Sequence, residues 1–230
     1  MIKLLTVCYN SACFVEKLCK STMNTCGIPY SITVVDNGSN ENDMHTLEIL
    51  KQKYNINILN RQQSEIYAPS RHHGEAIHFG LDTMNSEDNI AIVDCDSVFI
   101  FQNWGLMIEN LLKEYDHVTC MRPQTNDGCG AWFSAFKLEN IRNEKISFLP
   151  MLNHDGSDQK RNDKYDVGSD LARMRNWKPL KAHNKLRYSK RGHLWMLDGK
   201  PFIDHMGACR REKDMKNWDK WLMNNWRIKL

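Results

Sequence analysis

The sequence feature that most constrains the fold is the apolar run Ile90–Val93, which leads directly into Asp94-Cys95-Asp96. A short apolar run of this kind predicts a buried strand, and parallel sheets bind ligands at the carboxyl ends of their strands. Two carboxylates at such an end repel each other unless a cation or several hydrogen-bond donors neutralise them. Mg²⁺ and Mn²⁺ prefer oxygen ligands and commonly lie between carboxylates and phosphate groups. The motif therefore predicts a divalent-metal site that handles a phosphorylated substrate.

Strand-like and helix-like segments alternate along the first hundred residues. Strands are predicted at residues 2–8, 30–35, 56–59 and 90–93, and helices after Ser11 and at residues 43–53 and 73–85. This alternation predicts an α/β fold in which helices flank a mainly parallel sheet. Later in the chain, a helix is predicted at residues 104–115, strands at 117–122 and 131–136, and a polar loop at 150–166. We expect one domain with a variable C-terminal part.

Composition places the chain among globular proteins. Its 230 residues can bury one core, and a hydrophobic fraction of 41% with seven tryptophans excludes a disordered chain. No apolar run approaches the roughly 20 residues of a membrane span. Met1-Ile2-Lys3 leads straight into a predicted strand, so we expect no signal peptide. The eight cysteines form no Cys-x-x-Cys pair, so we expect reduced thiols and a cytoplasmic protein.

The net charge of +3 hides an asymmetry along the chain. Residues 1–170 carry 15 Lys/Arg against 23 Asp/Glu, a balance of −8, and residues 171–230 carry 16 against 5, a balance of +11. At the end of this basic part, tryptophans recur at helical spacing among lysines, which predicts a basic, Trp-rich helix in residues 211–230. We favour packing of this helix over the sheet. The alternative is a peripheral contact with an anionic membrane.

Polar residues also lie at the ends of the first two predicted strands. Thr6 and Asn10 lie at the end of the first strand, and Asp36 ends the second. Because the carboxyl ends of parallel strands meet at one edge of a sheet, these residues should line one pocket with Asp94 and Asp96. Asp36 precedes Asn-Gly-Ser, so its carboxylate can accept a hydrogen bond from a nucleobase N–H or a ribose hydroxyl, or close an Asx-turn.

Four segments in order carry a resemblance to a known family. They are TVCYN from Thr6, VVDNGS around Asp36, HGEAIHFGLD from His73, and VDCDS around Asp94 and Asp96. Together they resemble the N-terminal half of a family 2 glycosyltransferase with the GT-A fold. The resemblance implies a GT-A domain over residues 1–210, with a nucleotide-sugar-binding half at 1–100 and an acceptor-binding half at 101–210.

The resemblance also implies roles on the donor side. Thr6 and Asp36 would contact the nucleotide base, with Asn37 nearby. Asn10 would line the same pocket. Gly74 would lie on the nucleotide-binding side of its helix, where the family commonly has Asn-x-Gly and this chain has His-His-Gly.

At the metal, the resemblance implies that Asp96 binds Mn²⁺ or Mg²⁺ directly. Asp94 would contact the ribose, or the ion through water. His205 would be the third protein contact of the ion, although the chain has His-Met-Gly where relatives have His before Gly-Gly. Arg210 would reach the diphosphate.

The general base of such an enzyme is usually an acid in an acidic pair ahead of a helix. The corresponding stretch is Tyr165–Leu171, which lacks the common Glu-Asp pair. Asp170 is the first candidate base and Asp166 the second, although Asp170 can also cap the helix that follows it. One-step displacement by an acceptor hydroxyl would invert the anomeric configuration.

The implied function is therefore transfer of a sugar from a nucleotide-diphosphate donor, with a UDP-sugar favoured, to a hydroxyl of a glycan, a protein or a lipid-linked acceptor. A nucleotidyltransferase is one alternative, but Tyr9–Ala12 supplies no Gly-rich basic phosphate loop. A non-catalytic nucleic-acid binder would use the basic C-terminal residues with their tryptophans. It leaves the acids at the strand ends unexplained, so nucleic acid is not an expected partner.

Overall fold

Ten strands of the described residues form one sheet in the order β3-β2-β1-β4-β7-β6-β8-β9-β10-β5. The computed structural model describes residues 1–63, 69–121, 129–150, 167–174, 176–183, 193–207 and 212–226. The strands are β1 (Ile2–Cys8), β2 (Tyr30–Asp36), β3 (Asn57–Asn60), β4 (Asn89–Val93), β5 (Ser97–Phe99), β6 (His117–Met121), β7 (Cys129–Lys137), β8 (Trp177–Ala182), β9 (His193–Leu197) and β10 (Lys200–His205).

The parallel pairs are concentrated in the first half of the chain. Strand β1 pairs in parallel with β2 and β4, and β2 pairs in parallel with β3. Strand β7 then joins β4 and β6 in antiparallel pairs, and β6 pairs in parallel with β8. Beyond β8, the strands β9, β10 and β5 are joined by antiparallel pairs. The sheet is thus mixed, with its parallel strands where the predicted strand–helix alternation is strongest.

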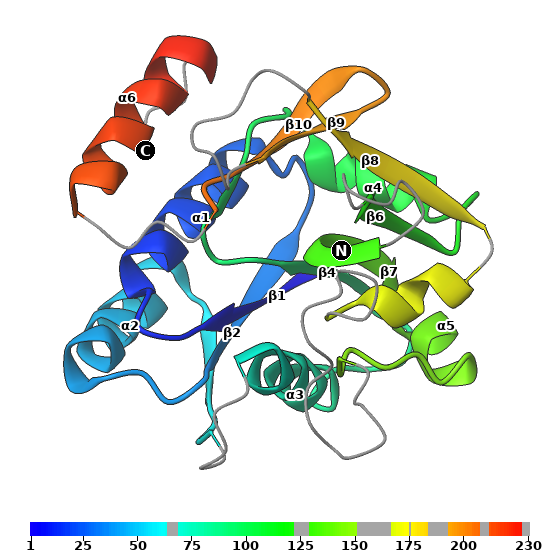
Figure 1. Cartoon of the computed structure of the whole chain (residues 1–230), viewed down its shortest axis with the longest axis horizontal. Coiled ribbons are helices and arrows are strands. Elements are labelled where there is room, and N and C mark those ends of the chain that lie inside the picture. The colour runs from blue at the N-terminus through cyan, green and yellow to red at the C-terminus, as the bar shows by residue number, and fades with distance from the viewer. Residues whose placement is uncertain are drawn as a thin grey trace.

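Helices cover both faces of the sheet, with α1 and α4 above it and α3 and α5 below it in Figure 1. The helices are α1 (Ala12–Thr25), α2 (Glu41–Tyr54), α3 (Pro69–Leu81), α4 (Trp104–Leu111), α5 (Leu138–Asn143), the short 3₁₀ helix η2 (Ser169–Arg173) and α6 (Glu212–Trp226). No helix in the described part of the chain is both long and apolar enough to cross a membrane.

Alternation along the central strands builds two cores, one on each face. In β1, Leu4 packs with α1 and α2, whereas Leu5 packs with α3. In β4, Val93 and Ile92 divide in the same way. Since side chains of a strand alternate between faces, a run that is apolar at every position is required where helices cover both sides. Burying each such side chain contributes about 1.5–3 kcal/mol.

The predicted helices are present, but α3 begins and ends four residues before the predicted 73–85, and α4 ends at Leu111 instead of residue 115. Leu47 and Leu50 of α2 are buried, whereas Met44, three positions before Leu47, is 42% exposed. Met44 lies in the first turn of α2 and lines a cavity beside Asp36, so it reaches past the core. The loop predicted at 150–166 lies outside the described residues, apart from Pro150.

The C-terminal helix α6 packs against α1 and the edge strand β5, which agrees with the favoured prediction that it packs over the sheet. Trp218 and Leu222 of α6 are fully buried against Phe14 of α1 and Val98 of β5. Lys17 of α1 also forms an ion pair with Asp219 of α6. The cysteines at positions 8, 13, 19, 26, 95 and 120 are free thiols, in agreement with the expected reduced state.

Candidate active site

Asp94, Cys95 and Asp96 form the turn between β4 and β5. Three backbone hydrogen bonds stabilise this turn. The N–H of Asp94 donates to Trp132 O of β7 (3.0 Å), and Ser97 N–H donates to Asp94 O (3.1 Å). The N–H of Met206, just after β10, donates to Asp96 O (2.9 Å). The two carboxylates therefore stand on a backbone that β7 and β10 support.

His205 completes a three-residue cluster with these acids. It is the last residue of β10 and pairs in register with Ser97 of β5. Its Nε2 lies 3.1 Å from Asp96 Oδ1 and 3.5 Å from Asp94 Oδ2. One ligand atom from each of the three residues lies within 4.8 Å of the other two. Two carboxylates and an imidazole form a donor set that suits a first-row divalent ion such as Mn²⁺, so the cluster could hold a metal ion.

The charges of this cluster perturb His205. Burial disfavours the charged imidazolium, but the carboxylates of Asp96 and Asp94 outweigh burial and raise the pKa of His205 to about 9. The protonated ring thus supplies the positive charge that two neighbouring carboxylates require. Burial also raises the pKa of the Cys95 thiol, so Cys95 stays protonated between the two acids. A divalent ion bound here would take over that neutralisation, and His205 would then be its ligand as the neutral imidazole.

A second histidine, which the sequence did not single out as a site residue, faces the cluster from α3. His73 Nε2 lies 3.8 Å from Asp94 Oδ1, and its side chain is partly exposed. Asp94 thus lies between an imidazole of α3 and one of β10. A sequence signal for His73 exists only in its position beside Gly74, within the segment that carries the family resemblance.

Asp36 ends β2 beside a small cavity. Asp36 is 2% exposed, and its carboxylate accepts a hydrogen bond from the N–H of Ser39, three residues further on (3.3 Å), which closes the turn after β2. It also lines a cavity of about 150 Å³ between β2, β3 and α2, together with Met44, His45, Leu47, Glu48, Ile58 and Asn60. Asp36 therefore both closes a turn and lines a cavity.

Asn37 and Asn10 hold the loops around Asp36. Asn37 Nδ2 donates to His72 O of α3 (3.2 Å), and its Oδ1 accepts from Arg61 Nη1 (2.6 Å). Asn10 Oδ1 accepts from both N–H and Nδ2 of Asn40 (2.8 Å each). Arg61 also forms an ion pair with Glu75 of α3. These amides join the ends of β1 and β2 to each other and to α3.

Thr6 and Gly74, two residues predicted on the donor side, are both buried. Thr6 is fully buried within β1, two residues before the strand ends. Gly74 is buried in α3, where an added Cβ would lie only 2.4 Å from Phe148 O. The glycine therefore has a packing reason, since it admits the backbone of Phe148 against the helix.

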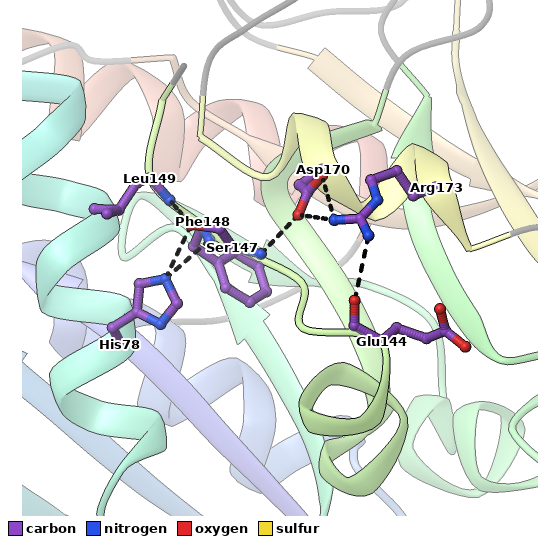
Figure 2. A network of polar contacts seen from close by, with 7 residues as sticks. All are labelled: His78, Glu144, Ser147, Phe148, Leu149, Asp170 and Arg173. Carbon is purple, nitrogen blue, oxygen red and sulfur yellow. Dashed lines mark hydrogen bonds and ion pairs between the residues drawn. The ribbon is translucent and has the colours of Figure 1, made fainter. Parts of the chain in front are cut away.

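Asp170, the first candidate base, lies in a network of polar contacts that Figure 2 shows. Its Oδ2 accepts from Ser147 N–H (2.8 Å), and both its oxygens accept from Arg173 Nη1 (3.2 and 3.1 Å). Arg173 Nη2 also donates to Glu144 O (3.4 Å). Phe148, the residue after Ser147, donates its backbone N–H to His78 Nε2 of α3 (3.0 Å).

The structure thus brings together some of the predicted residues. Asp94, Asp96 and His205 form one cluster, whereas Asp170 contacts Ser147 and Arg173. The second candidate base, Asp166, and the predicted diphosphate contact, Arg210, both lie outside the described residues.

Comparisons with known proteins agree with this fold. The model of Glycosyl transferase family 2 matches residues 4–218. No curated protein sequence matches the chain. The crystal structure of S. aureus TarS superposes with a TM-score of 0.58 at 11% identity, covering 99% of this chain and 44% of that chain. TarS 1-349 in complex with UDP-GlcNAc gives 0.52 at 12% identity, covering 99% and 68%.

A third solved structure is the mannosyltransferase PcManGT from Pyrobaculum calidifontis, in complex with GDP-Man and Mn²⁺. It gives a TM-score of 0.51 at 15% identity, covering 64% of this chain and 47% of that chain. This chain therefore spans less than half the length of PcManGT and of the longer TarS chain. At these identities the superpositions show the fold, and they confirm the predicted GT-A architecture. Because the family match extends over most of its length, the chain belongs to glycosyl transferase family 2.

Proposed function

We propose that the protein is a metal-dependent, inverting glycosyltransferase that moves a sugar from a nucleotide-diphosphate donor to an acceptor hydroxyl. The observation that carries the proposal is the cluster of Asp94, Asp96 and His205 beyond the carboxyl end of β4. In an α/β sheet this edge is where phosphorylated ligands bind. The family match supplies the reaction class.

The reaction needs charge neutralisation on one side of the sugar and proton removal on the other. The acceptor oxygen forms a bond to the anomeric carbon while the bond from that carbon to the diphosphate oxygen breaks. A divalent ion held by Asp94, Asp96 and His205 would neutralise the departing diphosphate. A carboxylate takes the acceptor proton, and Asp170 and Asp166 are the two candidates. A single displacement inverts the anomeric carbon.

The donor's base and ribose are proposed to lie beside Asp36. This carboxylate lines the cavity between β2, β3 and α2, and its second oxygen can accept a hydrogen bond from a base N–H. A UDP-sugar is the favoured donor, because the TarS structure with UDP-GlcNAc covers 99% of this chain and the PcManGT structure with GDP-Man covers 64%. The acceptor is proposed to be a hydroxyl of a glycan, a protein or a lipid-linked molecule.

Calorimetric titration of UDP and GDP, each with and without Mn²⁺, tests this proposal. The wild-type protein should bind a nucleoside diphosphate only when Mn²⁺ is present. Asp96→Asn, which removes one ligand charge, should weaken that binding at least tenfold, about 1.4 kcal/mol. Asp82→Asn is the matched control, because Asp82 is an exposed acid just after α3. Binding that ignores Mn²⁺, or no binding of either nucleotide, would overturn the proposal.

A further inference from the structure

One buried carboxylate outside the metal cluster receives three tryptophan side chains. Asp204 of β10 is 1% exposed. Its Oδ2 accepts from Trp221 Nε1 (2.9 Å) and from Trp226 Nε1 (3.3 Å), and its Oδ1 accepts from Trp218 Nε1 (3.4 Å). All three indoles belong to α6, which lies beside α1 and β10 in Figure 1. We call Asp204 and these three tryptophans the indole clamp.

The indole clamp has a clear energetic consequence. An unpaired buried carboxylate costs several kcal/mol, and hydrogen bonds to the ionised form recover that cost. Burial raises the pKa of Asp204, while the three indole N–H groups act against that rise. The carboxylate therefore holds α6 in place, and it loses its donors whenever α6 leaves the sheet.

The surface on which α6 rests is made of residues next to the candidate metal ligands. Asp204 immediately precedes His205, and Met206 immediately follows it. Met206 and Val98 are fully buried in the apolar cluster with Trp218 and Leu222, and Cys95, between Asp94 and Asp96, packs against that cluster. Each ligand of the metal cluster thus has a chain neighbour, at most two positions away, in contact with the α6 packing surface.

The geometry of β10 links the two sites directly. Successive side chains of a strand point to opposite faces, so Asp204 faces α6 while His205 faces the carboxylates. Fixing the Asp204 carboxylate therefore fixes the strand from which His205 projects. The hydrogen bond from Met206 N–H to Asp96 O (2.9 Å) extends this support to the turn that carries the acids.

We propose that the indole clamp positions the metal ligands, so that docking of α6 and binding of the divalent ion stabilise each other. This inference rests on the proposed metal site of the transferase. On this proposal, the Trp-rich C-terminal helix stabilises the metal site from within the same chain. Such a coupling must be reciprocal, because each event changes the other by the same factor.

The first test measures Mn²⁺ affinity, without any turnover. Trp221→Phe keeps an aromatic ring on α6 but removes the shortest N–H bond to Asp204. Its dissociation constant for Mn²⁺, measured by calorimetry, should be at least about fivefold higher than that of the wild type. Trp177→Phe is the matched control, since Trp177 lies in β8, stacked on His117. This control makes the same ring substitution away from α6 and should leave the constant within twofold.

The second test needs no variant of the clamp. Hydrogen exchange of the α6 amides should slow when Mn²⁺ is added to the wild-type protein, and Asp96→Asn should abolish that slowing. If wild type binds Mn²⁺ but Trp221→Phe binds it equally well, or if exchange in α6 ignores Mn²⁺, the coupling is wrong and the transferase proposal stands. If wild type binds no Mn²⁺ at all, the metal site itself fails and the coupling falls with it.

Discussion

His117 is a fully buried histidine whose titration affects the whole protein. It lies in β6, and its ring stacks on Trp177 at a centroid distance of 5.8 Å and an interplanar angle of 6°. Burial lowers the pKa of His117 from 6.5 to about 4. Between these pH values the unfolded chain binds a proton that the folded protein excludes, so acidification favours unfolding.

We therefore predict that the free energy of unfolding falls as pH falls through this window. From pH 7 to pH 4.5, His117 alone should account for a loss of about 2–3 kcal/mol. His117→Phe keeps an aromatic ring on Trp177 but cannot titrate. Over the same pH range, its free energy of unfolding should therefore fall by about 2–3 kcal/mol less than that of the wild type. Urea unfolding of both proteins at each pH measures the difference. Parallel pH profiles would show that burial does not exclude the proton from His117.

Asp170 has contacts that hold a segment of the chain in place. Its carboxylate joins Ser147 to Arg173, and Arg173 reaches back to Glu144 (Figure 2). We predict that Asp170→Asn and Arg173→Gln each reduce stability by about 1 kcal/mol, whereas only Asp170→Asn, which removes the first candidate base, abolishes sugar transfer. Thermal unfolding and transfer assays on both variants measure this. If Asp170→Asn abolishes transfer with donor binding intact while Arg173→Gln keeps transfer, the carboxylate itself is the base.

At the scale of elements, α3 contacts both the loop after β2 and the turn that carries Asp94 and Asp96. Its backbone accepts from Asn37 at His72, and its side chains reach Asp94 from His73 and Phe148 from His78. The absence of a side chain at Gly74 lets the segment around Phe148 approach the helix. A shift of α3 would therefore move its contacts with Asn37 and with Asp94 together.

Some of these elements could be predicted from the sequence, because their signals are local. The apolar runs that stop at Asp36 and Asp94 mark strand ends directly, and the α/β fold follows from their order, whereas the GT-A architecture is implied only by the family resemblance. His205 could be placed only through the family resemblance, since it lies 109 residues after Asp96. His73 and the indole clamp depend on how α3 and α6 are set against the sheet. Periodicity gives the face of a helix but not its partner.

At the scale of the molecule, the two predicted halves share one sheet. Strand β4 of the first half pairs with β7 of the second along five residue pairs, Asn89–Val93 with Phe133–Lys137. The core on the α1 face likewise contains residues of both halves, such as Leu4 and Trp195. A division at residue 100 therefore does not separate two independently packed cores.

This continuity predicts one cooperative unfolding transition. All seven tryptophans lie at or after residue 104, so their fluorescence reports only on the second half and α6. Far-UV circular dichroism reports also on α1, α2 and α3 of the first half. Because the halves share a sheet and a core, the two signals should give the same urea midpoint and the same slope, as two-state unfolding requires. Separated midpoints would show that the β4–β7 pairing opens before the rest of the sheet, and that the halves are held together only weakly.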